Sequence, residues 1–344
     1  MLRFECDYTE GCIPEILDAI SRENHTQYPG YSTDAICDRA RAKVKALCGR
    51  QDVDVHFLTG GTQANATVIT AALRPHQGVL AAQTGHISCH ETGAIEASGH
   101  KVLALPSDTG RLSANQIEAF CAAHWNDDTH EHQVQPAMVY LSHPAENGTL
   151  YTLEELTAIR AACDRWNLLL FVDGARLGYG LASPVNDVSV ADLARLTDVF
   201  YIGGTKVGAL FGEAVVLCHP ALKQDFRYLI KRQGGMLAKG WLLGLQFDVL
   251  LEDGRYVAIA RRAVEQALRI RDAFRRKGCS FLIESRTNQQ FPILNQEQMQ
   301  KLAANYAYSV WEPVDAGHTA VRFCTSWATT DAQVDQLIRD IEQL

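Results

Sequence analysis

An apolar run that stops at two glycines and leads to a lysine constrains this 344-residue chain most. Val199–Ile202 consists of β-branched, aromatic and aliphatic residues, and Gly203 and Gly204 follow directly. This pattern predicts a buried strand that ends at the glycines. Lys206 would then lie on the next loop, among small and apolar residues that partly desolvate its ammonium group and lower its pKa. Such a lysine can attack carbonyl carbons, although a single lysine on a loop more often only extends its charge into solvent.

A second apolar run ends in a similar way. Leu168–Val172 leads into Asp173, and Arg176 follows three residues later. Ligands of open α/β sheets bind at the carboxyl ends of the strands. We therefore expect Asp173, Arg176 and Lys206 to share one edge of a mostly parallel sheet, where an acid, an arginine and a lysine would form a catalytic cluster.

An upstream strand, loop and helix could hold an anion. Val53–Leu58 alternates like a strand, Gly60, Gly61 and Thr62 follow, and an apolar helix is expected from Ala66 to Leu73. Backbone N–H groups in such a loop and at a helix N-terminus attract phosphate. The loop matches neither the dinucleotide fingerprint nor the P-loop. The alternative is a non-catalytic phosphate or nucleotide binder that uses only this loop, but such a protein would not need an acid, an arginine and a lysine at neighbouring strand ends.

Composition and charge exclude several classes of partner. The formal net charge of −8 argues against nucleic-acid and anionic-membrane partners, which require a basic face. No uncharged stretch of transmembrane length and no secretory signal pattern is found. The ten cysteines include no Cys-x-x-Cys pair, so reduced thiols in a cytoplasmic protein are expected. His86 and His90 have zinc-ligand spacing, but no third ligand is specified, and no metal is predicted.

The combination of Asp173-Gly-Ala-Arg176 with a later strand, small-residue turn and Lys206 resembles the pyridoxal-phosphate (PLP) enzymes of the aspartate aminotransferase superfamily. More narrowly, it resembles the low-specificity L-threonine aldolase and β-eliminating lyase family, over essentially the whole chain. The resemblance implies the α/β fold type I architecture, with a mostly parallel sheet in a large domain and a smaller α+β C-terminal domain. A break in the pattern at Gly234 and Gly235 suggests that residues 1–235 form the N-terminal segment and PLP-binding domain, and residues 236–344 the small domain.

The resemblance also implies roles for the cofactor-binding residues. Lys206 would form a Schiff base with the PLP aldehyde, and Asp173 would pair with the pyridine nitrogen. The loop of Gly60, Gly61 and Thr62 would hold the phosphate. His86 would stack on the ring, and Arg176 would bind cofactor or substrate oxygens.

Further residues are expected to handle the substrate. By resemblance, Arg176 and Arg322 would hold the α-carboxylate, for which a planar two-pronged donor is suited. Tyr31 matches the tyrosine of a Tyr-Gly-x-Asp loop that reaches the active site in the family. Glu146 stands near the position where threonine aldolases often have a histidine, and His143 comes three residues earlier. Glu146 and His86 are therefore candidate acid–base residues, and the identity of the base stays open.

The implied activity is retro-aldol cleavage of L-threonine or L-allo-threonine to glycine and an aldehyde. The sequence does not reveal which substrate bond breaks, so β-elimination or racemisation of serine-like substrates is the alternative. Because sites of this superfamily lie between subunits, the resemblance also implies a homodimer or homotetramer that acts on a small amino acid.

Overall fold

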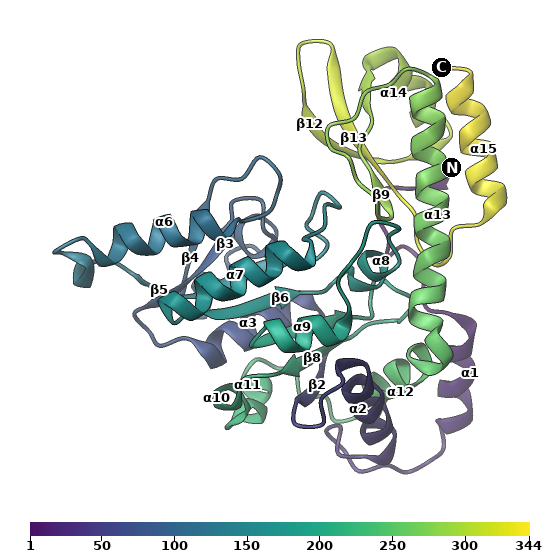
Figure 1. Cartoon of the computed structure of the whole chain (residues 1–344). Coiled ribbons are helices and arrows are strands. Elements are labelled where there is room, and N and C mark those ends of the chain that lie inside the picture. The colour runs from purple at the N-terminus through teal and green to yellow at the C-terminus, as the bar shows by residue number, and fades with distance from the viewer.

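The computed structural model describes residues 1–344, most of which are arranged around a seven-stranded sheet (Figure 1). Its strand order is β2-β8-β7-β6-β5-β3-β4, and only β8 runs antiparallel to its neighbours. The prediction of a mostly parallel sheet is therefore confirmed. The strands are β2 (Asp54–Leu58), β3 (Gln77–Ala82), β4 (Lys101–Leu105), β5 (Gln135–Ser142), β6 (Leu169–Asp173), β7 (Val199–Gly203) and β8 (Glu213–Leu217).

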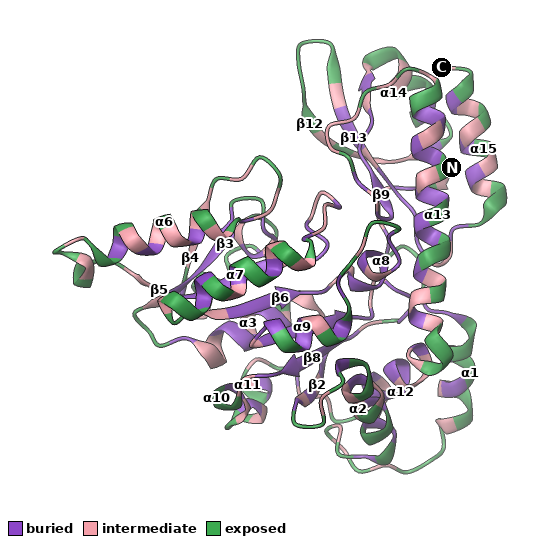
Figure 2. Ribbon diagram, in the orientation of Figure 1, coloured by how far each residue is buried: buried purple, intermediate pink, exposed green.

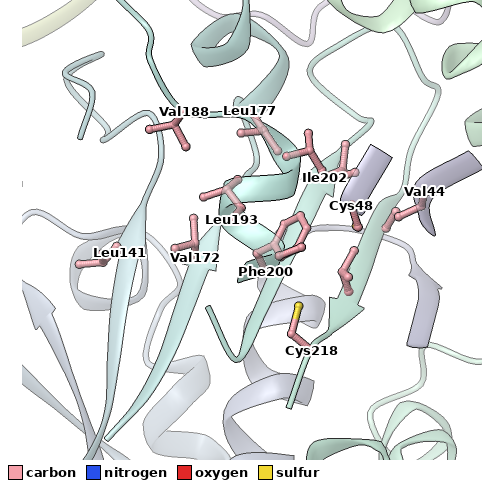
Figure 3. Packing of buried hydrophobic residues seen from close by; sticks show 14 of the residues in the cluster. Val44, Cys48, Leu141, Val172, Leu177, Val188, Leu193, Phe200, Ile202 and Cys218 are labelled. Carbon is pink, nitrogen blue, oxygen red and sulfur yellow. The ribbon is translucent and has the colours of Figure 1, made fainter. Parts of the chain in front are cut away.

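Both faces of this sheet are buried because side chains alternate along each strand. Val172, Phe200 and Ile202 pack on one face, in the cluster drawn in Figure 3. Phe171 and Tyr201 pack on the other face. The first face is covered by α2 (Ala35–Cys48), α6 (Ala114–Trp125), α7 (Leu153–Trp166), α8 (Leu177–Leu181), α9 (Val190–Leu196) and α12 (Trp241–Leu250). The second is covered by α3 (Gly61–Ala72), α4 (His86–Cys89), α5 (Ala94–Ala97), α10 (Pro220–Lys223) and α11 (Phe226–Arg232). Figure 2 shows the strands as a buried layer between partly exposed helices.

The smaller domain combines an antiparallel sheet with two packed helices. Its strands follow the order β10-β13-β12, and β9 also pairs with β13. Phe274, Phe323 and Leu337 lie in its separate apolar core. The elements are α13 (Arg255–Arg276), β9 (Gln289–Gln290), β10 (Ile293–Asn295), α14 (Gln296–Ala303), β11 (Tyr306–Ala307), β12 (Ser309–Pro313), β13 (His318–Cys324) and α15 (Asp331–Glu342). This is the α+β arrangement expected of the C-terminal part, and the boundary at residue 235 stays a prediction.

The N-terminal segment joins the two parts of the molecule. Strand β1 (Leu2–Arg3) pairs with β11, and Phe4 is buried in the apolar core of the small domain. The chain then returns to the large domain, where α1 (Pro14–Glu23) packs beside α12. Figure 1 accordingly shows the N-terminus beside α13 and α15. No helix is both long and apolar enough to cross a lipid bilayer.

The carboxyl ends of β6 and β7 approach each other unusually closely. The N–H of Gly203 donates to the carbonyl oxygen of Gly174 at 3.0 Å. A Cβ atom on Gly174 would lie 1.9 Å from the carbonyl oxygen of Tyr201, and one on Gly203 would lie 2.4 Å from that of Ala175. Only glycine fits at these two positions, which bring the residues after β6 against those after β7.

We expect Gly174→Ala to destabilise the protein by about 1–3 kcal/mol, because its methyl group would overlap backbone that has to move. The loss would be measured as a lower midpoint of thermal unfolding. Gly11→Ala is the matched control, since its nearest neighbour would be a side-chain carbon of Leu210 at 3.7 Å; its effect should stay within about 0.5 kcal/mol. Equal stability of the two variants would contradict the close packing of these strand ends.

Candidate active site

A cavity of about 310 Å³ lies at the carboxyl ends of β5, β6 and β7. Its wall brings together eight of the ten residues that the sequence analysis selected: Gly60, Gly61, Thr62, His86, Glu146, Asp173, Arg176 and Lys206. These residues come from five separate stretches of the chain. Ligands of α/β sheets bind at this edge, so the cavity has the expected position.

Lys206 lies on the turn that follows β7. Its carbonyl oxygen accepts a hydrogen bond from the hydroxyl of Tyr179 at 2.6 Å, and its Nζ lies 6.0 Å from the ring centre of Tyr8. Burial lowers the pKa of Lys206, and the positive charge of Arg176 lowers it further. The amine therefore carries its proton less firmly than a surface lysine does, as the apolar sequence around it predicted.

Asp173 ends β6 at the base of the cavity. Its Oδ2 accepts hydrogen bonds from the Tyr140 hydroxyl at 2.5 Å and from Nδ2 of Asn65 at 3.2 Å, and its Oδ1 accepts one from the Ala175 N–H at 2.9 Å. Burial alone would raise the pKa of Asp173, but the charge of His86 and these hydrogen bonds hold it below its usual value. The carboxylate is therefore kept ionised although it is buried.

His86 begins α4 and is linked to Asp173 through two buried side chains. Its Nδ1 lies 2.8 Å from Oε1 of Glu91. Asn65 Nδ2 donates to that same oxygen at 2.7 Å as well as to Asp173. Burial would lower the pKa of His86, but the hydrogen bond to Glu91 and the charge of Asp173 raise it. The imidazole is thus oriented and favoured in its charged form.

Glu146 projects into the cavity from the turn after β5. Its Oε1 accepts hydrogen bonds from the Ser142 hydroxyl at 2.6 Å and the His86 N–H at 2.8 Å, whereas its Oε2 is buried without a partner. Burial raises the pKa of Glu146. His143 does not line the cavity; its ring is fully buried, and burial lowers its pKa to about 4. Of the two residues, only Glu146 faces the site.

Arg176 is fixed by a buried carboxylate from the N-terminal segment. Its Nε and Nη2 donate to the two carboxylate oxygens of Asp7 at 2.7 and 2.9 Å, and Nδ2 of Asn288 donates to Asp7 at 2.9 Å. Burial would raise the pKa of Asp7, but Arg176 and Lys206 lower it to about 2. The ion pair with Asp7 therefore orients Arg176, and Nη1 of Arg176 takes no part in it.

A second cavity, of about 940 Å³, adjoins the first and shares Arg176 and Lys206 with it. Arg322 lines this outer cavity at a guanidinium distance of 5.4 Å from the Trp311 ring. Its Nη2 donates to the carbonyl oxygen of Glu5 at 2.7 Å, whereas its Nε is buried without a partner. The two predicted carboxylate-binding arginines therefore face one continuous space.

Tyr31 lines neither cavity. It is 44% exposed and has a backbone φ of 62°. The Nζ of Lys231 lies 5.0 Å from the centre of its ring. Asp34 caps α2 by accepting a hydrogen bond from the Cys37 N–H at 2.9 Å. A single chain thus does not bring Tyr31 to its own site, and the predicted role of Tyr31 stays a prediction.

Glu213 and Tyr8 are among the cavity residues that the sequence analysis did not select. Glu213 is the single charged residue of β8, and its place directly after Gly212 at the start of an apolar strand is the signal that could have identified it. Tyr8 lines both cavities, but nothing in its sequence context separates it from an ordinary loop aromatic residue.

Comparison with known proteins identifies the family. The family model described as beta-eliminating lyase matches residues 10–297. The structure of a threonine aldolase from Leishmania major is 43% identical, covers 100% of this chain and 99% of its own, and superposes with a TM-score of 0.97. The low specificity L-threonine aldolase of Pseudomonas sp. (strain NCIMB 10558) is 28% identical over 98% of this chain and 96% of its own. A serine palmitoyltransferase from Sphingomonas wittichii, 15% identical with a TM-score of 0.72 over 99% of this chain and 86% of its own, shares the fold. The resemblance predicted from the motifs is confirmed, and the chain belongs to the β-eliminating lyase family of fold type I enzymes.

Proposed function

We propose that this protein is a PLP-dependent aldehyde-lyase that cleaves L-threonine or L-allo-threonine to glycine and an aldehyde. The observation that carries the proposal is the meeting of Lys206, Asp173 and His86 in one cavity. The full-length similarity to the Leishmania major threonine aldolase supports this choice of reaction. β-Elimination or racemisation of serine-like substrates is less favoured, because the relatives that match the whole chain are named threonine aldolases.

The residues of the cavity fit PLP. The ionised carboxylate of Asp173 would hold a protonated pyridine nitrogen, and the His86 ring would stack on the cofactor ring. Gly60 is the N-cap of α3, so Gly61 and Thr62 stand in the first turn, where unpaired N–H groups favour a phosphate. A Cβ on Gly61 would lie 3.0 Å from the Tyr201 hydroxyl, so glycine at this position keeps the cavity open beside the start of α3.

When bound, PLP would withdraw electrons from the α-carbon of the amino acid, which is what carbon–carbon cleavage requires. Lys206 would hold the cofactor covalently through its readily deprotonated amine. Arg176, through Nη1, and Arg322 would orient the substrate carboxylate. Glu146 would take the proton of the β-hydroxyl group, because its Oε2 has no hydrogen-bond partner and burial raises its pKa, which makes it a stronger base than an exposed carboxylate.

We further propose that the protein works as a homodimer or homotetramer. Tyr31 is exposed and lies outside the cavities of its own chain. In an assembly, Tyr31 of one subunit would reach the cavity of the next and contribute to substrate binding. Light scattering of the purified protein measures the number of subunits.

Lys206→Ala should abolish covalent attachment of the cofactor. We expect no cofactor to be fixed by borohydride reduction, and turnover of L-threonine to fall by about 10³-fold or more, equivalent to about 4 kcal/mol in the activation barrier. Mass spectrometry after reduction and a glycine assay measure the two effects. Lys101→Ala, at an exposed position of edge strand β4, is the control. A Lys206→Ala protein that keeps reducible PLP and full turnover would refute the proposal.

Glu146→Gln should remove the base while keeping the shape of the side chain. We expect turnover to fall about 10²-fold or more, with cofactor binding retained. Because a base must be deprotonated to act, the wild-type activity should decline as the pH falls through the raised pKa of Glu146, and the variant should lack this limb. The measurement is kcat/KM from pH 5 to 8, with the exposed Glu131→Gln as control. If the limb persists in Glu146→Gln, the proton acceptor is another group, such as His86.

A further inference from the structure

Glu213 is a buried carboxyl group in an otherwise apolar strand. It is 3% exposed and begins β8, opposite Gly203 of β7 and Leu58 of β2. Val215 and Leu217, which follow on the same face of β8, belong to the apolar core under the sheet. Glu213 instead lines the cavity that contains Lys206. Burying an ionisable group here is costly unless it has defined partners.

The partners of Glu213 are the two residues that precede Lys206. Its Oε1 accepts a hydrogen bond from the Thr205 hydroxyl at 2.9 Å, and its Oε2 accepts one from the Gly204 N–H at 3.2 Å. The Thr205 hydroxyl in turn accepts from the Gly212 N–H at 3.0 Å. Each carboxylate oxygen is therefore tied to the turn from which the lysine projects.

This turn has little freedom to move. A Cβ on Gly204 would lie 2.8 Å from the carbonyl oxygen of Gly212 and 2.9 Å from the ring of Phe247. The Gly204 and Thr205 N–H groups also donate to the carbonyl oxygen of Gly212, at 2.9 and 3.2 Å. The Glu213 side chain adds two further bonds to this backbone pairing, so the start of β8 sets the position of the lysine.

The charges around Glu213 couple it to Lys206. The titratable groups that face it are Lys206 on the turn, Asp173 on β6, Tyr201 on β7 and Tyr256 on α13. The end of β2 and the start of α3 contribute only uncharged residues. Burial raises the pKa of Glu213 to about 8, although Thr205 and Lys206 oppose this rise. Burial also lowers the pKa of Lys206, so the pKa values of both groups are shifted in the direction that favours their uncharged forms.

We propose that Glu213 is a positioning residue for Lys206. Its carboxyl group holds the Gly204–Thr205 turn in place and increases the proton affinity of the lysine nitrogen. This inference rests on the proposed function, in which Lys206 carries PLP. An ionised Glu213 carboxylate would stabilise positive charge on the lysine nitrogen, whereas a protonated one would not.

The test compares wild-type protein with Glu213→Gln after loading with PLP. The visible absorption band is titrated from pH 6 to 10, since it reports the proton on the nitrogen that joins Lys206 to the cofactor. Removing a neighbouring negative charge destabilises that proton, so the midpoint of the variant should lie lower by about half a pH unit or more. The exposed Glu131→Gln should titrate like the wild type.

A second pair of variants tests the clamp. Thr205→Val removes the hydroxyl that donates to Glu213, and Thr205→Ser retains it. We expect protein stripped of cofactor to recombine with PLP about tenfold or more slowly in Thr205→Val than in the wild type, because the amine is less well positioned. Thr205→Ser should restore the rate. This comparison also decides the matter if circular dichroism shows that Glu213→Gln does not fold.

The outcomes separate the two proposals. If wild-type protein takes up no PLP that borohydride can fix, the proposed function fails, and the role of Glu213 fails with it. If the wild type is loaded normally but Glu213→Gln titrates at the same midpoint, or Thr205→Val recombines at the wild-type rate, the role of Glu213 alone is overturned.

Discussion

The site depends on the contact between the carboxyl ends of β6 and β7. Gly174 and Gly203 lack side chains and share a backbone hydrogen bond, so the two strand ends lie closer than any other residues would allow. Asp173 directly precedes one glycine, and the turn that carries Lys206 directly follows the other. Parallel pairing alone would put both residues at one edge, and the glycine contact brings the carboxylate and the amine into one cavity.

The pKa values of the buried carboxyl groups around this cavity are shifted in opposite directions because their partners differ. Asp7 faces Arg176, and Asp173 faces His86 and a set of hydrogen-bond donors, so both have lowered pKa values and stay ionised. Neither Glu146 nor Glu213 accepts a hydrogen bond from a positively charged side chain, and burial raises the pKa values of both. Asp7 and Asp173 therefore stabilise neighbouring positive charges, whereas Glu146 and Glu213 hold a proton more readily than ordinary carboxyl groups do.

Local sequence patterns predicted much of this arrangement. The apolar runs before Asp173 and Lys206 located β6 and β7. Helix α3 begins at Gly61 rather than at Ala66, because Gly60 is its N-cap and Gly61 already belongs to its first turn. The pairing of Arg176 with Asp7 could not be predicted, since it joins residues 169 positions apart. The same limit applies to the proposed role of Tyr31, because a contact with a neighbouring subunit would be a property of the assembly rather than of its local sequence.

The N-terminal segment explains why one site needs both domains. Phe4 is held in the apolar core of the small domain, and the carbonyl oxygen of Glu5 accepts a hydrogen bond from Arg322. Asp7 then binds Arg176 of the large domain and Asn288 of the small one, while Tyr8 lies over Lys206. Because the ion pair of Asp7 is buried, separating the domains would leave its charges without partners at high cost. The segment thereby fixes the distance between the two arginines that would hold the substrate carboxylate.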